Sequence, residues 1–201
     1  MRKMLAALTA LTMILLLLTA CAEAPSITGK WVMEIPYEDL TGSVPSEMEL
    51  GELAGYVDYD ALKLTACYTF HEDRTYTFKA EVEQYIKDCR SFWIEAINAY
   101  YTDEIAARNL AITVEEAWEL DGIDVNELVD AEGIRAAFAE VGSEGNYKTV
   151  DGKLYLSAGK DYRVSDSVYT LFEISGNTMT FTEAVGAESP ATFPITLTKA
   201  S

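Results

Sequence analysis

The chain has 201 residues, with 33 aspartates and glutamates against 15 lysines and arginines, which gives a formal net charge of −18 at pH 7. A protein this acidic is repelled by nucleic acids and by anionic lipid surfaces, so we expect neither to be a partner bound through charge. The length is sufficient for one domain with a hydrophobic core.

The first twenty-one residues form a segment of their own. Arg2 and Lys3 precede an uncharged, mostly apolar run of 17 residues, Met4 to Ala20, which is typical of a secretory signal peptide. The run ends in Leu18-Thr19-Ala20-Cys21, which resembles the lipobox of bacterial lipoproteins. The resemblance implies that the leader is removed, that Cys21 carries a lipid, and that the protein is extracytoplasmic and anchored to a bacterial membrane. The alternative is an uncleaved anchor helix, for which the run has about the minimum length.

Loss of residues 1–20 removes two basic residues and no acid, so the remaining chain has a net charge of −20. This charge is uneven along the chain. Residues 82–144 contain 15 acidic and 4 basic residues, whereas residues 145–201 contain 6 acidic and 5 basic residues. We divide the mature chain into a lipidated tether, 21–27, and one domain, 28–201.

The domain begins with strand patterns. Residues 28–37 alternate between apolar and polar side chains, and so do residues 62–70 and 75–80. The polar stretch Glu72-Asp73-Arg74-Thr75 joins the last two in a tight hairpin. Between the first and second of these strands, residues 39–60 lose the pattern and are rich in glycine and acid, which predicts a long loop with at most one helical turn near 47–53.

A helical block follows. From Val82 the apolar residues recur at intervals of three and four, which predicts an amphipathic helix to about Asn109. Thr113 with Glu116 and Asp124 with Glu127 are capping-box patterns, and they predict two shorter helices, the last ending near Gly142. We therefore expect a helical insertion over 82–143.

Strand patterns return after the insertion, at 147–150, 153–157, 168–175, 178–183 and 192–199. Asp151-Gly152 and Gly176-Asn177 are tight-turn signals, so short and long connections alternate along the whole chain. In an antiparallel meander this alternation puts every long connection at the same end. The fold class predicted is mainly β with an α insertion between strands 3 and 4, in the form of an eight-stranded up-and-down antiparallel barrel with a closed end and an elaborated mouth.

At this point the chain resembles a known family. Gly29-Lys30-Trp31 is similar to the G-x-W signature of lipocalins, and the strand count, the long first loop and the final strands, Leu171 to Phe181, are similar to lipocalin-like domains of bacterial lipoproteins. The resemblance covers 28–81 and 146–199 and implies a lipocalin-like barrel that binds small apolar molecules. Lipocalins place a basic residue over this tryptophan, for which Lys199 and Arg163 are the candidates.

Eight strands enclose either a packed core or room for one small ligand. The candidate ligand-lining residues are Met33, Tyr68, Tyr76, Phe78, Leu154, Phe172, Phe181 and Phe193. A packed core would use the same side chains, so both alternatives stay open. Aromatic residues on the long helix, from Phe92 to Tyr101, would plug the mouth or form a groove for a protein partner over 82–143.

The chain has few groups that carry chemistry. Cys67 and Cys89 form either a disulfide, worth about 3 kcal/mol, or two buried free thiols. His71 is the only histidine, and Asp121 to Glu127 lacks oxygen ligands at Ile123 and Val125, so we expect no catalytic site, metal or cofactor.

The predicted function is non-catalytic binding of a small apolar or amphipathic molecule. The alternative is a protein-interaction or envelope-scaffold module that uses the acidic insertion.

Because the first predicted strand starts at the tight-turn end of the barrel, the tether should lie at the closed end. The lipid on Cys21 would then hold that end near the membrane, and the mouth with its helices would point away from it.

Overall fold

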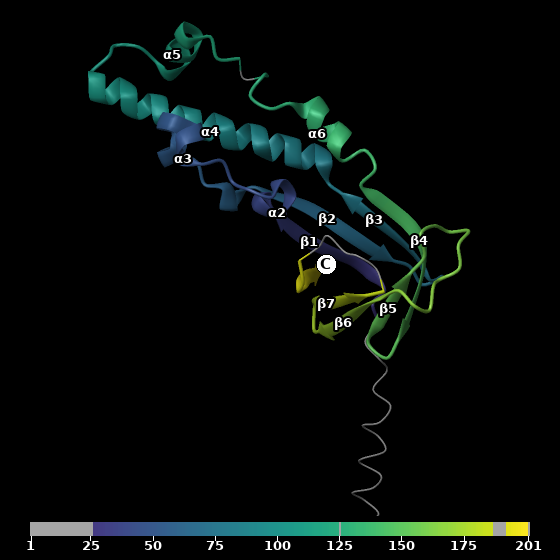
Figure 1. Ribbon diagram of the computed structural model, residues 1–201. Coiled ribbons are helices and arrows are strands. Elements are labelled where there is room, and N and C mark those ends of the chain that lie inside the picture. Colours follow the sequence, from purple (N-terminus) through teal and green to yellow (C-terminus); the bar gives the residue numbers. More distant parts are fainter. Residues whose placement is uncertain (1–25, 125, 187–191, 201) are drawn as a thin grey trace, which may run out of the picture.

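The computed structural model describes residues 26–124, 126–186 and 192–200, and the segment predicted to be a signal peptide and Cys21, the predicted lipidation site, lie outside this part. Eight antiparallel strands close into a barrel in sequence order, as predicted (Figure 1). The strands are β1 (Gly29–Pro36), β2 (Lys63–Phe70), β3 (Thr75–Ala80), β4 (Gly142–Val150), β5 (Lys153–Leu156), β6 (Tyr169–Ser175), β7 (Thr178–Val185) and β8 (Ile195–Lys199).

The helices lie in two connections. Between β1 and β2 are α2 (Tyr37–Thr41), α3 (Glu47–Leu50) and the 3₁₀ turns η1 (Gly51–Tyr56) and η2 (Tyr59–Ala61). Between β3 and β4 are α4 (Val82–Arg108), α5 (Val114–Asp121) and α6 (Ala131–Ala137). Figure 1 shows α4 running along the mouth side of β1 and β2 and continuing past them to α5. The first connection is therefore more helical than the loop that the sequence predicts.

The start of the third helix of the insertion differs from prediction. The third helix begins at Ala131 and is capped by Asp130, whose carboxylate accepts from the Gly133 amide. The capping box predicted at Asp124 is wrong, because that side chain accepts from the Asn126 amide and forms a local turn. The box at Thr113 is confirmed, with reciprocal bonds to Glu116.

Strand β4 begins five residues before the predicted start. Residues 142–146 have no apolar alternation, yet they pair with β3 from Lys79/Gly142 to Thr75/Asn146. Pairing with an existing strand therefore sets this boundary, not intrinsic strand propensity.

The connections separate by length as predicted. Residues 71–74, Asp151-Gly152 and Gly176-Asn177 close tight turns at one end of the barrel, and the four long connections leave from the other ends of the strands. Asp151 and Gly152 both have positive φ, 50° and 73°, as a two-residue hairpin turn requires. Gly29, the first residue of β1, pairs with Phe70 beside a tight turn, so the described chain enters at the closed end.

The closed end is packed. Trp31 is 1% exposed, and its indole Nε1 donates to the Ile27 carbonyl at 2.6 Å. The cluster around it consists of Ile27, Phe70, Tyr76, Tyr147, Leu154, Met179, Phe181 and Leu197. Of the two candidate basic residues, Lys199 lies over the Trp31 ring.

A second apolar cluster lies at the mouth. It joins Tyr59 and Leu62 from the first connection, Leu64 of β2, Tyr85 and Cys89 of α4, and Val129. Phe92 and Trp93 pack against the Tyr59 ring in this cluster, while the hydroxyls of Tyr100 and Tyr101 donate to the carboxylates of Glu52 and Asp121. The aromatic residues of α4 thus bind this helix to the neighbouring loops and to α5.

The two remaining cysteines are free thiols, and both are buried. Cys67 lies on β2 with its thiol near the Glu81 carboxylate, whereas Cys89 lies in the mouth cluster beside Tyr85. Of the two alternatives for this pair, the structure therefore has the two buried free thiols and not the disulfide, and the two side chains belong to different packing environments. Among the described helices, none has the length and apolar character needed to cross a membrane.

Candidate functional site: a slot between β1 and β8

The barrel closes where its first and last strands meet, and this seam is short. β1 and β8 pair only at Trp31/Lys199 and Val32/Thr198. Continued in the same register, the ladder would place Glu34 opposite Thr196 and Pro36 opposite Pro194. Proline has no amide hydrogen to donate, so the second of these pairs cannot form ladder hydrogen bonds. The mouth half of the seam is open between the two strands.

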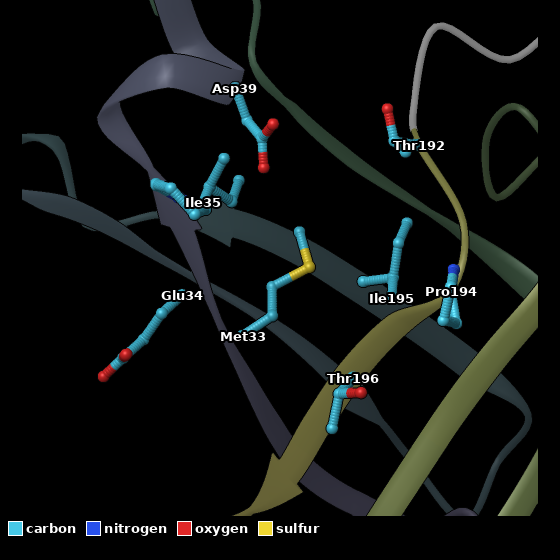
Figure 2. A pocket seen from close by; sticks show the side chains of 9 residues that line it. Met33, Glu34, Ile35, Asp39, Thr192, Pro194, Ile195 and Thr196 are labelled. Carbon is cyan, nitrogen blue, oxygen red and sulfur yellow. The ribbon is translucent and has the colours of Figure 1, made fainter. Parts of the chain in front are cut away.

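This opening is a slot with a volume of about 420 Å³. Figure 2 shows that Met33 and Ile195 point into it from opposite sides, with Ile35 above them. The other lining residues are Glu34, Pro36, Asp39, Thr192, Pro194 and Thr196. The volume is within the range of pockets that hold small ligands.

The slot leads into the barrel. Met33 pairs with Ala66 and Ile195 pairs with Phe181, both of which have buried side chains on the inner face of the sheet. Both lining residues also pack against the core cluster around Trp31. Leu197, two residues after Ile195, is fully buried at 0% exposure in the core cluster, so the barrel interior on the closed-end side of Ile195 is packed. The slot is thus a blind pocket over a packed floor, open to the side.

The charged groups at the slot are acidic. The Glu34 carboxylate points away from it and pairs with Lys63 at 3.3 Å. The Asp39 carboxylate, in the middle of α2, points toward the slot and has no ion-pair partner in the part of the chain that the structure describes (Figure 2). Among the described residues, no lysine or arginine lines the slot. An anionic group placed there would therefore meet uncompensated negative charge.

The structure brings the predicted lining residues to the barrel interior, mostly below the slot. Tyr76, Leu154 and Phe181 are buried in the core cluster, and Met33, Tyr68, Phe172 and Phe193 pack against it. The ring centroids of Phe78 and Tyr68 are 4.6 Å apart. Only Met33 of the eight lines the slot. These aromatic residues mainly pack against one another, so the space for a ligand lies above them.

Sequence reasoning missed the residues that make the opening. Pro36 and Pro194 each lie in a predicted strand, at 28–37 and 192–199, and a proline in a strand is a signal of an unpaired edge. Because the first and last strands of a barrel are neighbours, a proline in each of them indicates that the open edge lies at the seam between these two strands.

Reactive chemistry is sparse at the site. In the described ranges, no group of three or more histidine, cysteine, aspartate or glutamate side chains is placed to hold a metal ion. His71 is exposed in the turn before β3, on the closed end of the barrel. Burial raises the pKa of the Tyr68 hydroxyl to about 12, so this residue is uncharged at neutral pH.

A scan of protein-family models and searches of curated proteins and of solved structures found no match to this chain.

Proposed function

We propose that this protein is an exported lipoprotein with a lipocalin-like barrel, and that it binds a small amphipathic molecule in the slot between β1 and β8 without chemical turnover. The leader sequence that ends at Cys21 supports export and lipidation. The closed barrel, Trp31 at its base and the lysine over that ring support the likeness to lipocalins. The helices between β3 and β4 are then an insertion at the mouth.

One observation carries the proposal. A slot of about 420 Å³, whose apolar lining residues are Met33, Ile35, Pro36, Pro194 and Ile195, enters the barrel where the strands cannot close. A gap of this kind in the wall of a small barrel exposes Met33, Ile35 and Ile195 to solvent, and burial of those side chains by an apolar ligand is favourable by roughly 25 cal/mol per Å². The packed floor limits the depth of insertion, so the ligand leaves one end at the surface.

The charge of the slot selects among amphipathic molecules. Asp39 and the absence of lysine and arginine from the lining disfavour a carboxylate or phosphate head group. We therefore expect an uncharged head group on an apolar chain. The lipid on Cys21 would hold the closed end near the membrane, and the slot, which opens sideways in the mouth half of the barrel wall, would lie farther from the membrane.

The test compares two ligands with the same chain. The protein is titrated with 1-monolauroylglycerol and with laurate, each below the concentration at which it forms micelles, in competition with the fluorescent probe N-phenyl-1-naphthylamine. We expect the uncharged glyceride to displace the probe at least tenfold more tightly than laurate. Equal displacement by both, or by neither, would overturn the proposal.

Variants assign the binding to the slot. Met33→Trp fills the slot and should lower glyceride affinity at least tenfold. Met48→Trp makes the same change on α3 at a side chain that is 90% exposed, and it should leave affinity unchanged. Asp39→Asn should raise laurate affinity and have little effect on the glyceride.

A second candidate function, protein interaction through 82–143, is favoured by one surface feature. Leu120 of α5 is 76% exposed and Leu110 is 46% exposed, far from the barrel at the distal end of α4 (Figure 1). A photo-cross-linking residue at 120 should then yield one protein adduct in cells, and the same residue at 48 should not. Identical adducts from both positions would exclude this role.

A further inference from the structure

A second pocket lies in the helical cap, separate from the slot. It has a volume of about 450 Å³, is open to solvent on one side, and is lined by α2, η2, α4 and the segment that includes α6. Both cavities use α2, since Asp39 lines the slot whereas Tyr37 and Leu40 line this pocket. No residue lines both of them, so a ligand in one does not occupy the other.

Aromatic rings form much of the wall of this pocket. Tyr37, Tyr59, Tyr85, Trp93 and Phe138 all line it. The ring centroids of Tyr37 and Tyr59 are 4.8 Å apart, and those of Tyr59 and Trp93 are 6.3 Å apart in an edge-on arrangement. Tyr85 meets Phe138 of the last insertion segment at 6.4 Å. These contacts fix the rings before any ligand enters, which reduces the entropy lost on binding.

Two polar groups at the pocket have unused hydrogen-bonding capacity. The Tyr59 hydroxyl is buried and has no hydrogen-bond partner among the described residues, which is an unfavourable state for a buried polar group. The Asp130 carboxylate accepts from the Gly133 amide through Oδ1 at 2.9 Å, and no described contact engages Oδ2. In the part of the chain that the structure describes, no lysine or arginine lines the pocket.

We propose that this pocket binds a protonated amine attached to a small apolar body. The faces of tyrosine and tryptophan rings attract cations, and an ammonium N–H donates to a phenol or carboxylate oxygen. Asp130 supplies the opposite charge, and Leu62, Val129 and Ile134 contact the apolar body. This inference concerns a different cavity from the slot and does not depend on the proposed function.

The test uses three molecules of one shape. Phenethylamine is protonated at pH 7, 2-phenylethanol has a hydroxyl in place of the ammonium, and phenylacetate carries a negative charge. Each is titrated into the protein by calorimetry. We expect phenethylamine to bind at least tenfold more tightly than the alcohol, and phenylacetate to bind more weakly than both. Equal affinity for amine and alcohol, or no binding of the amine, would overturn the proposal.

Matched variants locate the binding. Ala136 and Ala137 are adjacent exposed residues on α6, and only Ala137 lines the pocket, so Ala137→Trp should abolish phenethylamine binding while Ala136→Trp retains it. Asp130→Asn keeps a residue that caps the helix but removes the charge, and it should weaken amine binding about fivefold, whereas Asp124→Asn should not. Retained binding in Ala137→Trp would contradict the assignment.

The slot variant separates the two proposals. Met33→Trp should leave phenethylamine affinity unchanged while it lowers glyceride affinity. Loss of both affinities in Met33→Trp, with the folded structure intact by circular dichroism, would contradict the independence of the two sites.

Discussion

The Lys199 ammonium lies 5.3 Å from the centroid of the Trp31 ring, so the last strand of the barrel covers the base of the first. The same two residues are paired across the β1/β8 seam. Gly29 makes room for this contact, because a Cβ there would lie 3.1 Å from Lys199 Cε. One short stretch of the seam therefore combines strand pairing, ring burial and a cation–π contact.

Replacement of the lysine should weaken this closure. We expect Lys199→Met to lower the free energy of unfolding by about 1 kcal/mol, because the cation over a buried ring is lost while the aliphatic contacts remain. Urea denaturation followed by tryptophan fluorescence measures the change. The control is Lys30→Met on β1, next to Trp31 in the chain, where an exposed ion pair to Glu81 at 3.8 Å should contribute less than about 0.5 kcal/mol. Equal effects of the two substitutions would contradict a specific role of the contact.

A close approach of two backbones should make Gly145 intolerant of any side chain. A Cβ at this position of β4 would lie 2.7 Å from the carbonyl oxygen of Ser157 and from its Oγ. We expect Gly145→Ala to cost about 1–3 kcal/mol of stability by overpacking. Gly55→Ala, where nothing lies within 4 Å of the new atom, is the control in the same thermal-unfolding experiment. A Gly145→Ala protein as stable as the control would show that this region can relax.

The open seam should be sensitive to its prolines. Pro36→Val restores an amide hydrogen opposite the carbonyl of Pro194 and allows the ladder to extend toward the mouth. We expect the slot to narrow and the affinity for 1-monolauroylglycerol to fall several-fold. Pro45→Val, in the first connection and away from the slot, should leave the affinity unchanged. Unchanged binding in the Pro36→Val protein would mean that something other than proline keeps the strands apart.

The stability of the barrel should fall at alkaline pH, in part through Tyr68. Burial raises the pKa of this residue to about 12 in the folded protein from its ordinary value of 10.0. Between these pH values the unfolded chain loses the proton and the folded protein keeps it, so this contribution is complete below pH 10 and decreases by about 1.4 kcal/mol per pH unit above it. Urea midpoints at pH 9 and pH 11 should differ less for Tyr68→Phe than for the unsubstituted protein. If the two proteins lose the same amount of stability between pH 9 and pH 11, a group other than Tyr68 is responsible for the loss.

The parts of the fold that were predictable from sequence are those with a local signal. Alternation at Tyr76, Phe78 and Ala80 identified β3, and Asp151-Gly152 identified a hairpin whose turn needs positive φ at both residues. The separation of tight turns from long connections then led to the barrel. Each of these signals depends on residues near one another in the chain.

Features that depend on a distant partner were missed. Residues 142–146 form part of β4 because they pair with the edge of β3. The third helix is capped by Asp130, six residues after the predicted cap at Asp124. The slot depends on two prolines more than 150 residues apart, which face each other only after the barrel has closed. The aromatic side chains were correctly placed in the barrel, but no local pattern indicates how tightly they pack.

The most direct test of the slot uses its two opposing methyl-bearing side chains. With ¹³C-labelled methionine and isoleucine methyl groups, the protein is titrated with 1-monolauroylglycerol and observed by NMR. We predict that the Met33 ε-methyl and Ile195 δ1-methyl resonances shift together along one saturating curve, while the Ile134 δ1-methyl in the helical pocket stays in place. Saturable shifts at Ile134 without shifts at Met33 and Ile195, or no shift at any of them, would contradict the account.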